Sequence, residues 1–139
     1  MKILQIIDSV EGGGAEKLAV KLHHAYLEKK LDSHLLSLTN CCLINLPNIY
    51  YLNQRSPYQL SVLLKLYSCL RESRWNTLDV IHVHLFPAQF IVPIITKISG
   101  IKADLVTTEH TTFNRRRNTS FGKVIDNLFY KYYTKIIYI

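Results

Sequence analysis

Three consecutive glycines, Gly12, Gly13 and Gly14, stand between a short apolar run and an amphipathic stretch near the start of the chain. Glycine lets the backbone turn sharply and lets a ligand approach closely, and the free N–H groups of a following helix attract anions. The loop fails two phosphate fingerprints, because Lys17 replaces the third glycine of the dinucleotide motif and no Gly-Lys-Ser/Thr triplet is present. The dinucleotide motif also needs an acid near Asn40, so an NAD-linked oxidoreductase is disfavoured. We expect a ligand loop of another kind, with a flexible turn that binds nothing as the alternative.

Two further groups of polar residues follow apolar strand-like segments. His82 and His84 share one face of the segment 79–84, and we expect His84 to meet a ligand at the strand end and His82 to be a hydrogen-bonded structural residue. Glu109 and His110 follow a later strand, where a neutral imidazole could hydrogen-bond a sugar hydroxyl. These four residues are possible zinc ligands, but two histidines on a strand are a common accident, and we expect no metal.

A basic run, Arg115, Arg116 and Arg117, accounts for much of the formal charge of +7 and the isoelectric point near 9.4. Arginines can fork onto phosphate oxygens, so these three are candidate anion-binding residues, with a solvated basic loop as the alternative. A non-catalytic module that docks this loop on an anionic membrane or a partner chain is a second possible function. Nucleic acid is not expected as a partner, because the other basic residues are scattered.

The 139 residues predict a single α/β domain, residues 1–139, with a doubly wound parallel sheet in three α/β/α layers, Rossmann-like. Strands are predicted at residues 2–7, 33–38, 49–52, 79–84, 103–108 and 135–139. Helices are predicted from Ala15, from Ser56-Pro57 to near Arg74, from Pro87 to Ser99 and from Phe121 to Tyr133. The second helix is expected to bury Leu60, Leu63, Leu64, Tyr67 and Leu70. Ligands of such sheets bind at the carboxyl ends of the strands, where the strand order reverses.

Targeting signals and disulfides are not expected. No secretory signal opens the chain, and the longest apolar stretch, residues 85–95, is too short for a bilayer. The three cysteines suggest reduced thiols, so we expect a cytoplasmic protein, peripheral at most at the inner face of the membrane.

Taken together, these loops resemble the amino-terminal domain of the family 4 retaining glycosyltransferases, which have the GT-B fold. The matching pieces are Lys2-Ile3-Leu4-Gln5-Ile6-Ile7-Asp8 with Gly12-Gly13-Gly14-Ala15-Glu16, Asp79-Val80-Ile81-His82-Val83-His84, Thr107-Thr108-Glu109-His110 and Lys135-Ile136-Ile137-Tyr138-Ile139. They cover nearly the whole chain in the family's order.

The resemblance implies a hexosyltransferase that moves a sugar from a nucleotide-sugar donor to a glycan or lipid-linked acceptor in polysaccharide or glycoconjugate biosynthesis. It implies that the glycine loop lies against the donor's phosphates and the acceptor, and that His110 is the catalytic histidine near the transferred sugar. His84, Phe86 and Glu109 would line the acceptor cleft. No metal or other cofactor is implied, since the nucleotide-sugar is a substrate.

One departure from the family is large. Its members carry a second Rossmann domain that holds the nucleotide and contains two glutamates eight residues apart, and this chain has no such domain. The chain is therefore expected to be inactive alone and to need a carboxy-terminal domain, in cis or as a separate chain. We expect a fragment of a longer enzyme rather than a separate partner chain.

Overall fold

The structure is a computed structural model that describes residues 1–39, 44, 46–109 and 129–139. Six strands and three α-helices alternate along this part of the chain, with one 3₁₀ turn, η1 (Ser73–Trp75). The strands are β1 (Lys2–Ile7), β2 (Asp32–Thr39), β3 (Ile49–Gln54), β4 (Val80–His84), β5 (Asp104–Glu109) and β6 (Lys135–Tyr138). The helices are α1 (Gly14–Glu28), α2 (Leu60–Leu70) and α3 (Ala88–Ser99).

The strands form one six-stranded sheet in the order β3-β2-β1-β4-β5-β6, and every pair is parallel. This is the Rossmann strand order, in which the chain first builds outward from β1 to β3 and then restarts on the other side of β1 with β4. The predicted fold class is confirmed. The point where the order reverses lies between β1 and β4.

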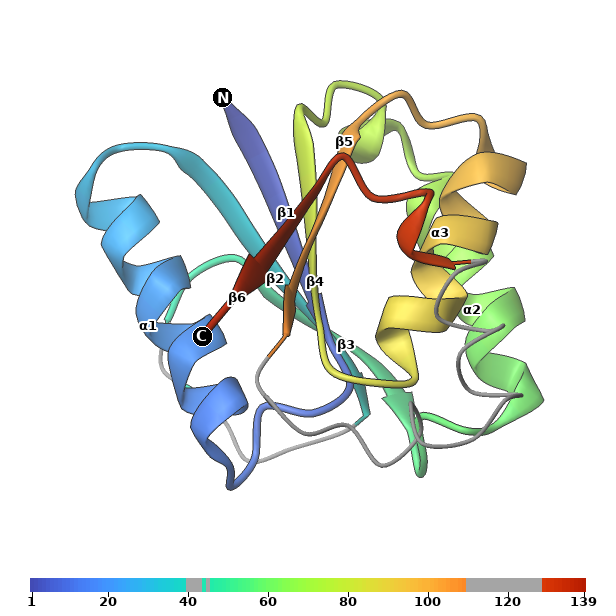
Figure 1. The fold of residues 1–139 in the computed structure, drawn as a ribbon, viewed down its shortest axis with the longest axis horizontal. Helices are drawn as coiled ribbons and strands as arrows, with labels where there is room; N and C mark the ends of the chain where they lie inside the picture. The colour runs from blue at the N-terminus through green and yellow to red at the C-terminus, as the bar shows by residue number, and fades with distance from the viewer. Residues whose placement is uncertain (40–43, 45, 110–128) are drawn as a thin grey trace.

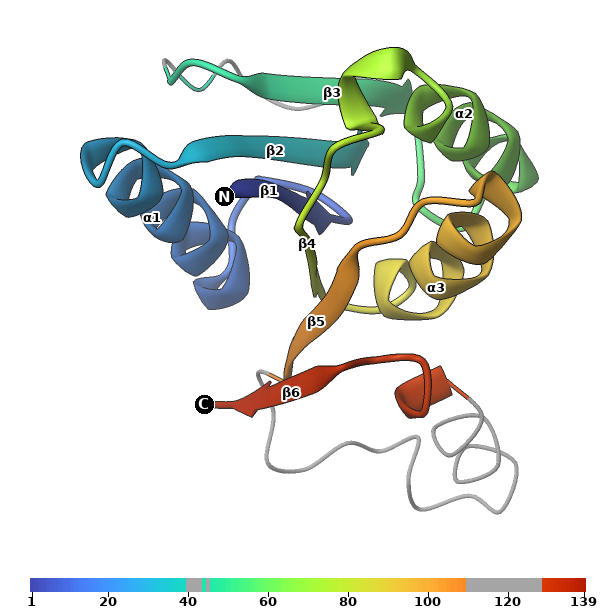
Figure 2. The same ribbon diagram turned by 90° about the horizontal axis from the view of Figure 1, so that it is seen from above.

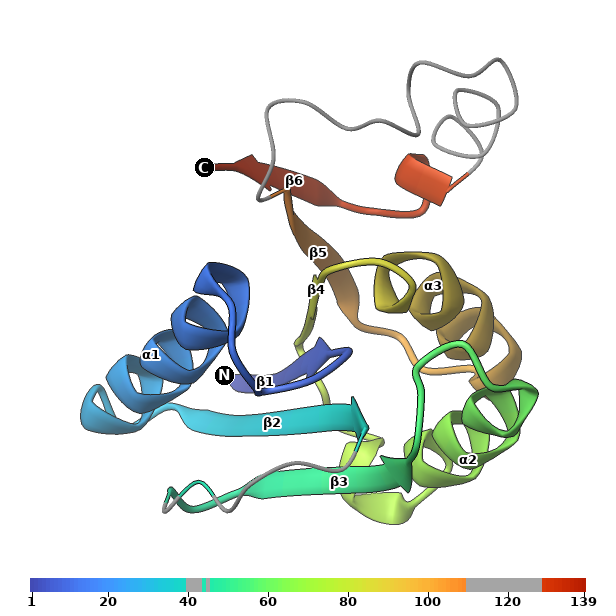
Figure 3. The same ribbon diagram turned by 90° about the horizontal axis from the view of Figure 1, so that it is seen from below.

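The helices divide between the two faces of the sheet, as Figures 1 and 2 show. Helix α1 covers one face, where it packs on β1 and β2, and α2 and α3 lie side by side on the other. In Figure 1 the strands run downward from the N-terminus, so their carboxyl ends gather toward the bottom of the view. Figure 3, seen from below, looks onto that edge, where the loops after β1 and β4 pass close to the middle of the sheet.

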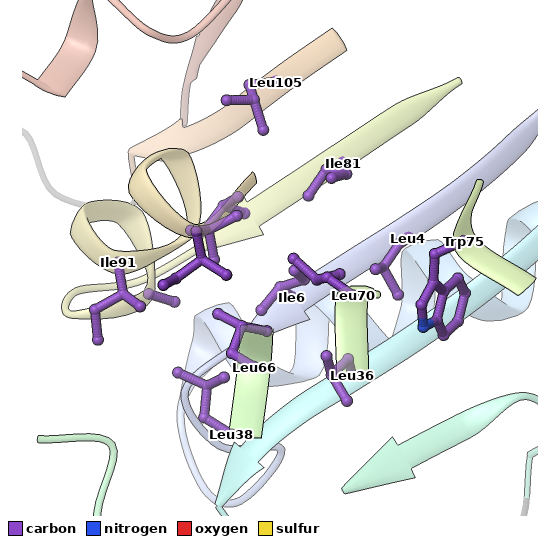
Figure 4. Packing of buried hydrophobic residues seen from close by; sticks show 14 of the residues in the cluster. Leu4, Ile6, Leu36, Leu38, Leu66, Leu70, Trp75, Ile81, Ile91 and Leu105 are labelled. Carbon is purple, nitrogen blue, oxygen red and sulfur yellow. The ribbon is translucent and has the colours of Figure 1, made fainter. Parts of the chain in front are cut away.

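The main hydrophobic core lies between the sheet and the pair α2 and α3 (Figure 4). Alternate residues of the central strands point into it, including Leu4 and Ile6 of β1 and Ile81 of β4. Leu66 and Leu70 of α2 meet them from the helix layer. A smaller cluster under α1 contains Ile7, Val10, Ala19 and Leu35. The period of two along each strand therefore divides the apolar residues between two helix layers.

Helix α1 is fixed to the sheet through a buried histidine. His23 is fully buried, and its ring nitrogens lie 2.8 Å from Ser33 Oγ and 2.8 Å from the Pro47 carbonyl oxygen. A carbonyl can only accept, so Nε2 carries the proton and Nδ1 accepts from the Ser33 hydroxyl. Burial lowers the pKa of His23. His23 is therefore a buried histidine with both ring nitrogens hydrogen-bonded.

The prediction for α2 was wrong at its start and in its buried face. Ser56 accepts from the Tyr58 backbone N–H at 3.3 Å in a turn, and the helix begins only at Leu60. Its buried residues are Val62, Leu66 and Leu70. The others predicted to be buried are exposed or half-buried, namely Leu60, Leu63, Leu64 and Tyr67. The sequence of α2 carries two apolar stripes, and the sheet covers the one that the spacing did not favour.

Helix α3 ends as predicted. Gly100 follows it with a φ of 75°, a left-handed conformation that glycine adopts without strain. Pro93 lies inside the helix and is buried. In the part of the chain that the structure describes, no helix combines the length and apolar character needed to cross a bilayer.

Candidate functional site

The switch point between β1 and β4 is the natural place for a ligand site in this sheet. Residues 8–13 leave the carboxyl end of β1, and residues 85–87 leave the neighbouring end of β4. Both connections lead directly into a helix, α1 from the first and α3 from the second. Two helix N-termini and two loops are therefore brought together at one edge of the sheet.

Asp8 joins the two connections. Its Oδ1 accepts a hydrogen bond of 2.9 Å from the backbone N–H of Ala88, the first residue of α3. Its carbonyl oxygen accepts from the backbone N–H and the hydroxyl of Thr39, at 3.0 and 2.9 Å. Asp8 thus ties together the ends of β1 and β2 and the start of α3.

The Asp8 carboxyl group has an unusual acidity. It is only 7% exposed, and burial raises its pKa from 3.8 to about 7. The Ala88 N–H opposes this rise, and the charge of Glu16 adds to it. A buried carboxyl that titrates near neutrality at a switch point is typical of functional sites, although structural networks can produce it too.

The glycine loop has a different requirement at each position. Gly12 has a φ of 96°, which only glycine adopts without strain. Gly13 is the N-cap of α1, and a Cβ there would clash with the Glu16 carboxylate. Gly14 has open space around it. Glu16 therefore already places a negative charge at the N-terminus of α1, next to Gly13, where the dipole favours it.

The two histidines of β4 lie inside the domain. His84 is fully buried, with Nε2 3.2 Å from Gln5 Oε1, and its ring centroid lies 4.1 Å from that of His82. His82 is buried as well, with Nε2 2.7 Å from Thr108 Oγ1. Since these residues alternate with the core residues Ile81 and Val83, they face the α1 side of the sheet. The structure places His84 beneath the surface, between β1 and β5, and not in the mouth of a cleft.

Glu109 ends β5 and is held in a network on the opposite side of the sheet. The Tyr130 hydroxyl donates to its Oε1, and Gln89 Nε2 lies 3.4 Å from the same oxygen. Gln89 Nε2 also donates to Thr107 Oγ1 at 2.9 Å. The Tyr133 hydroxyl donates to the Gln89 carbonyl oxygen at 2.6 Å, and burial raises the pKa of Tyr133. Glu109 is therefore a buried, positioned carboxyl rather than an open one.

Phe86 is the accessible member of the predicted acceptor cleft. It is 42% exposed, two residues after the end of β4, and its ring centroid lies 6.3 Å from that of Tyr58 and 6.3 Å from that of Phe90. His84, Phe86 and Glu109 thus occupy three environments: His84 lies on the α1 face, Glu109 on the α3 face and Phe86 at the edge between strand and helix.

The remaining predicted site residues, His110 and Arg115 to Arg117, lie outside the described residues. Within the described ranges, no three His, Cys, Asp or Glu side chains group in a way that could hold a metal ion.

Two polar residues at the site were not selected from the sequence. Asp8 ends the first apolar run of the sequence, and Gln89 interrupts an apolar stretch. In each case the usable signal was one polar residue at the border of, or within, a strongly apolar segment. Such a residue is buried with its neighbours and must find a hydrogen-bond partner.

The sequence matches no family model, and no curated protein is significantly similar to it. The structure itself shows a parallel six-stranded α/β domain.

Proposed function

We propose that this chain is the acceptor-side half of a two-domain sugar transferase of the GT-B type. In this proposal it holds a glycan or lipid-linked acceptor at the β1–β4 switch point, and a second, nucleotide-binding domain completes the enzyme. The observation that carries the proposal is the hydrogen bond from Ala88 to Asp8, which fixes the glycine-loop connection against the connection after β4.

The electrostatics favour an acceptor over a phosphate at this wall of the cleft. Asp8 and Glu16 bring carboxyl groups to the start of α3 and α1, the two positions where helix N–H groups would otherwise attract an anion. The Glu16 carboxylate repels phosphate, and carboxyl oxygens accept hydrogen bonds from sugar hydroxyls. The donor's diphosphate is therefore assigned mainly to the opposite domain, and the glycine loop to the acceptor.

The accessible surface next to this loop suits a sugar ring. Phe86 presents a half-exposed aromatic ring close to the first turn of α3, and Tyr58 lies beside it. An aromatic ring gives a rigid contact for the apolar face of a sugar. Asp8 and Glu109 act as positioning residues behind this surface.

Transfer assays test the proposal. The chain alone is expected to show negligible transfer from nucleotide-sugars and only weak binding of them. Transfer should appear when a GT-B nucleotide-binding domain is added and acceptor is present. Efficient transfer by the chain alone, or tight binding of nucleotide-sugar without acceptor, would contradict the assignment of this half.

A further inference from the structure

Large apolar side chains are exposed along one surface of the molecule, the outer side of α2 and α3. Leu60 is 82% exposed, Leu64 74% and Ile98 63%. Tyr67 and Ile94 between them are also exposed, and Tyr58 and Phe86 continue the surface to the carboxyl edge of the sheet. We call this set the α2–α3 face.

The α2–α3 face contains a groove of about 420 Å³ between the two helices. Every residue that lines it is apolar or aromatic: Leu63, Leu64, Tyr67, Phe90, Ile91, Ile94, Ile95 and Ile98. A continuous exposed apolar surface of this kind is unusual for a domain that is surrounded only by water.

The charges around the α2–α3 face are mostly positive, and Glu72, which follows α2, is ion-paired with Arg74. Residues 55–71 and 85–103 contain no aspartate or glutamate. They contain five cationic side chains, all exposed, which are Arg55, Lys65, Arg71, Lys97 and Lys102. Lys97 Nζ lies 5.6 Å from the ring centroid of Tyr132, a half-exposed aromatic beside α3.

Helix α1, on the opposite side of the sheet, differs both in its exposed apolar side chains and in its charges. None of its large apolar side chains is exposed, and it carries Glu16 and Glu28 together with Lys17 and Lys21. The basic and apolar character is therefore not a general property of the helices but is confined to one layer.

We propose that the α2–α3 face docks on the surface of an anionic lipid bilayer. Exposed Leu, Ile and aromatic side chains would enter the headgroup region, and the surrounding Lys and Arg side chains would meet anionic headgroups. None of the residues 115–117 belongs to the set that defines this face, and the proposal stands without the transfer activity. It also brings Phe86, at the edge of the candidate site, close to the bilayer.

Charge decides between a bilayer and a second copy of the chain as the occupant. The nearby Glu72 is already paired with Arg74, and a two-fold dimer through this face would bring the same cations of both copies together. An anionic leaflet neutralises them instead. The α2–α3 face is thus complementary to negatively charged lipid and not to itself.

Vesicle flotation with matched variants tests the docking. The full chain is mixed with phosphatidylcholine vesicles with or without phosphatidylglycerol, at low and high salt. We expect binding to the anionic vesicles that weakens with salt. Leu64→Glu combined with Ile98→Glu should reduce the partition coefficient at least about tenfold, because both side chains are exposed and leave the core unchanged. Lys65→Gln combined with Lys97→Gln should weaken binding only where phosphatidylglycerol is present.

The control for both variants is Lys21→Gln combined with Lys29→Gln, which changes the net charge equally but on the side of α1. It should bind like the unchanged chain. Equal losses in all three variants would mean that net charge alone attracts the protein, and would overturn the proposal. So would an absence of binding, or a salt-resistant dimer that forms without vesicles and is lost in Leu64→Glu/Ile98→Glu.

A fluorescence measurement does not depend on these charge changes. The single tryptophan, Trp75, is fully buried, so a second tryptophan at position 64 reports on the α2–α3 face. Emission from Leu64→Trp should shift to shorter wavelength with anionic vesicles, while that from His24→Trp, exposed on α1, should not. A shift in both variants, or in neither, would contradict docking through α2 and α3.

Discussion

The carboxyl group of Asp8, at the end of β1, accepts a hydrogen bond from the backbone N–H of Ala88, the first residue of α3. The donor is one of the N–H groups that no intrahelical partner can satisfy. A side chain that is distant in sequence therefore caps α3, since no side-chain cap comes from its own N-cap, Pro87. The same contact fixes the geometry of the switch point.

The first prediction concerns pH and Asp8. Because the folded-state pKa of Asp8 is raised to about 7, the folded protein holds this proton more tightly than the unfolded chain. Its contribution to the free energy of unfolding is complete below pH 3.8 and is lost as the pH rises toward about 7. Each unit of pKa difference is worth ~1.4 kcal/mol.

Asp8→Asn removes this titration but keeps an oxygen that accepts from Ala88. Asparagine matches the protonated acid in size and charge, so the variant should equal the unchanged protein at low pH and exceed its stability above neutrality. Urea unfolding over a series of pH values measures the difference. Parallel stability profiles for the two proteins would show that Asp8 is not the titrating group.

The second prediction concerns His23, whose pKa is lowered by burial. Its contribution to stability is present above its ordinary pKa of 6.5 and is lost as the pH falls through the lowered value. His23→Ala removes two hydrogen bonds and leaves a cavity, and should cost about 2–4 kcal/mol at neutral pH. His24→Ala is the control, since His24 is exposed and should change stability by at most about 0.5 kcal/mol. Similar losses in both variants would rule out the buried contacts as the cause.

The third prediction separates the glycines. Gly12→Ala must hold a φ of 96° and should lose about 1–2 kcal/mol. Gly14→Ala lies at the start of α1 with open space and should be neutral or up to about 1 kcal/mol more stable. Thermal unfolding measures both. If Gly14→Ala destabilises the protein as much as Gly12→Ala, the difference between the strained position 12 and the open position 14 is contradicted.

Gln89 provides the fourth prediction. Gln89→Leu nearly keeps the size of the side chain but removes the donor to Thr107 and Glu109. The variant should lose about 1–3 kcal/mol of unfolding free energy. If Glu109 positions the acceptor, acceptor affinity should fall as well, measured by calorimetry under conditions where the variant is fully folded. An unchanged affinity together with reduced stability would restrict Gln89 to a structural role.

Much of the fold could be predicted from the sequence because parallel strands are buried on both faces. The run at Lys2–Ile7 is apolar at four of its six positions, and Gly100 ends α3 in a left-handed conformation that few other residues adopt. Such signals are local, because they depend on residues close together in the sequence and not on which element packs against them.

The features of the fold and of the site that the sequence did not predict depend on neighbours in the tertiary structure. In α2, Leu60 and Leu64 are as apolar as Leu66 and Leu70, and only the position of the sheet decides which stripe is covered. His84 ends its strand, as expected, opposite the last residue of β1, but its side chain lies on the α1 face of the sheet and is fully buried there. A residue at a strand end is accessible only if its side chain is not covered by neighbouring side chains on its own face.

The central claim is that the β1–β4 switch point holds a sugar acceptor. Titration of the ¹⁵N-labelled chain with glycan and lipid-linked acceptors, and separately with nucleotide-sugars, tests it most directly. We predict that an acceptor shifts the amide signals of Gly12, Gly13, Gly14 and Phe86, while nucleotide-sugars cause only small changes. Saturable shifts confined to residues away from this edge, or strong nucleotide-sugar binding at the glycine loop with no response to any acceptor, would contradict it.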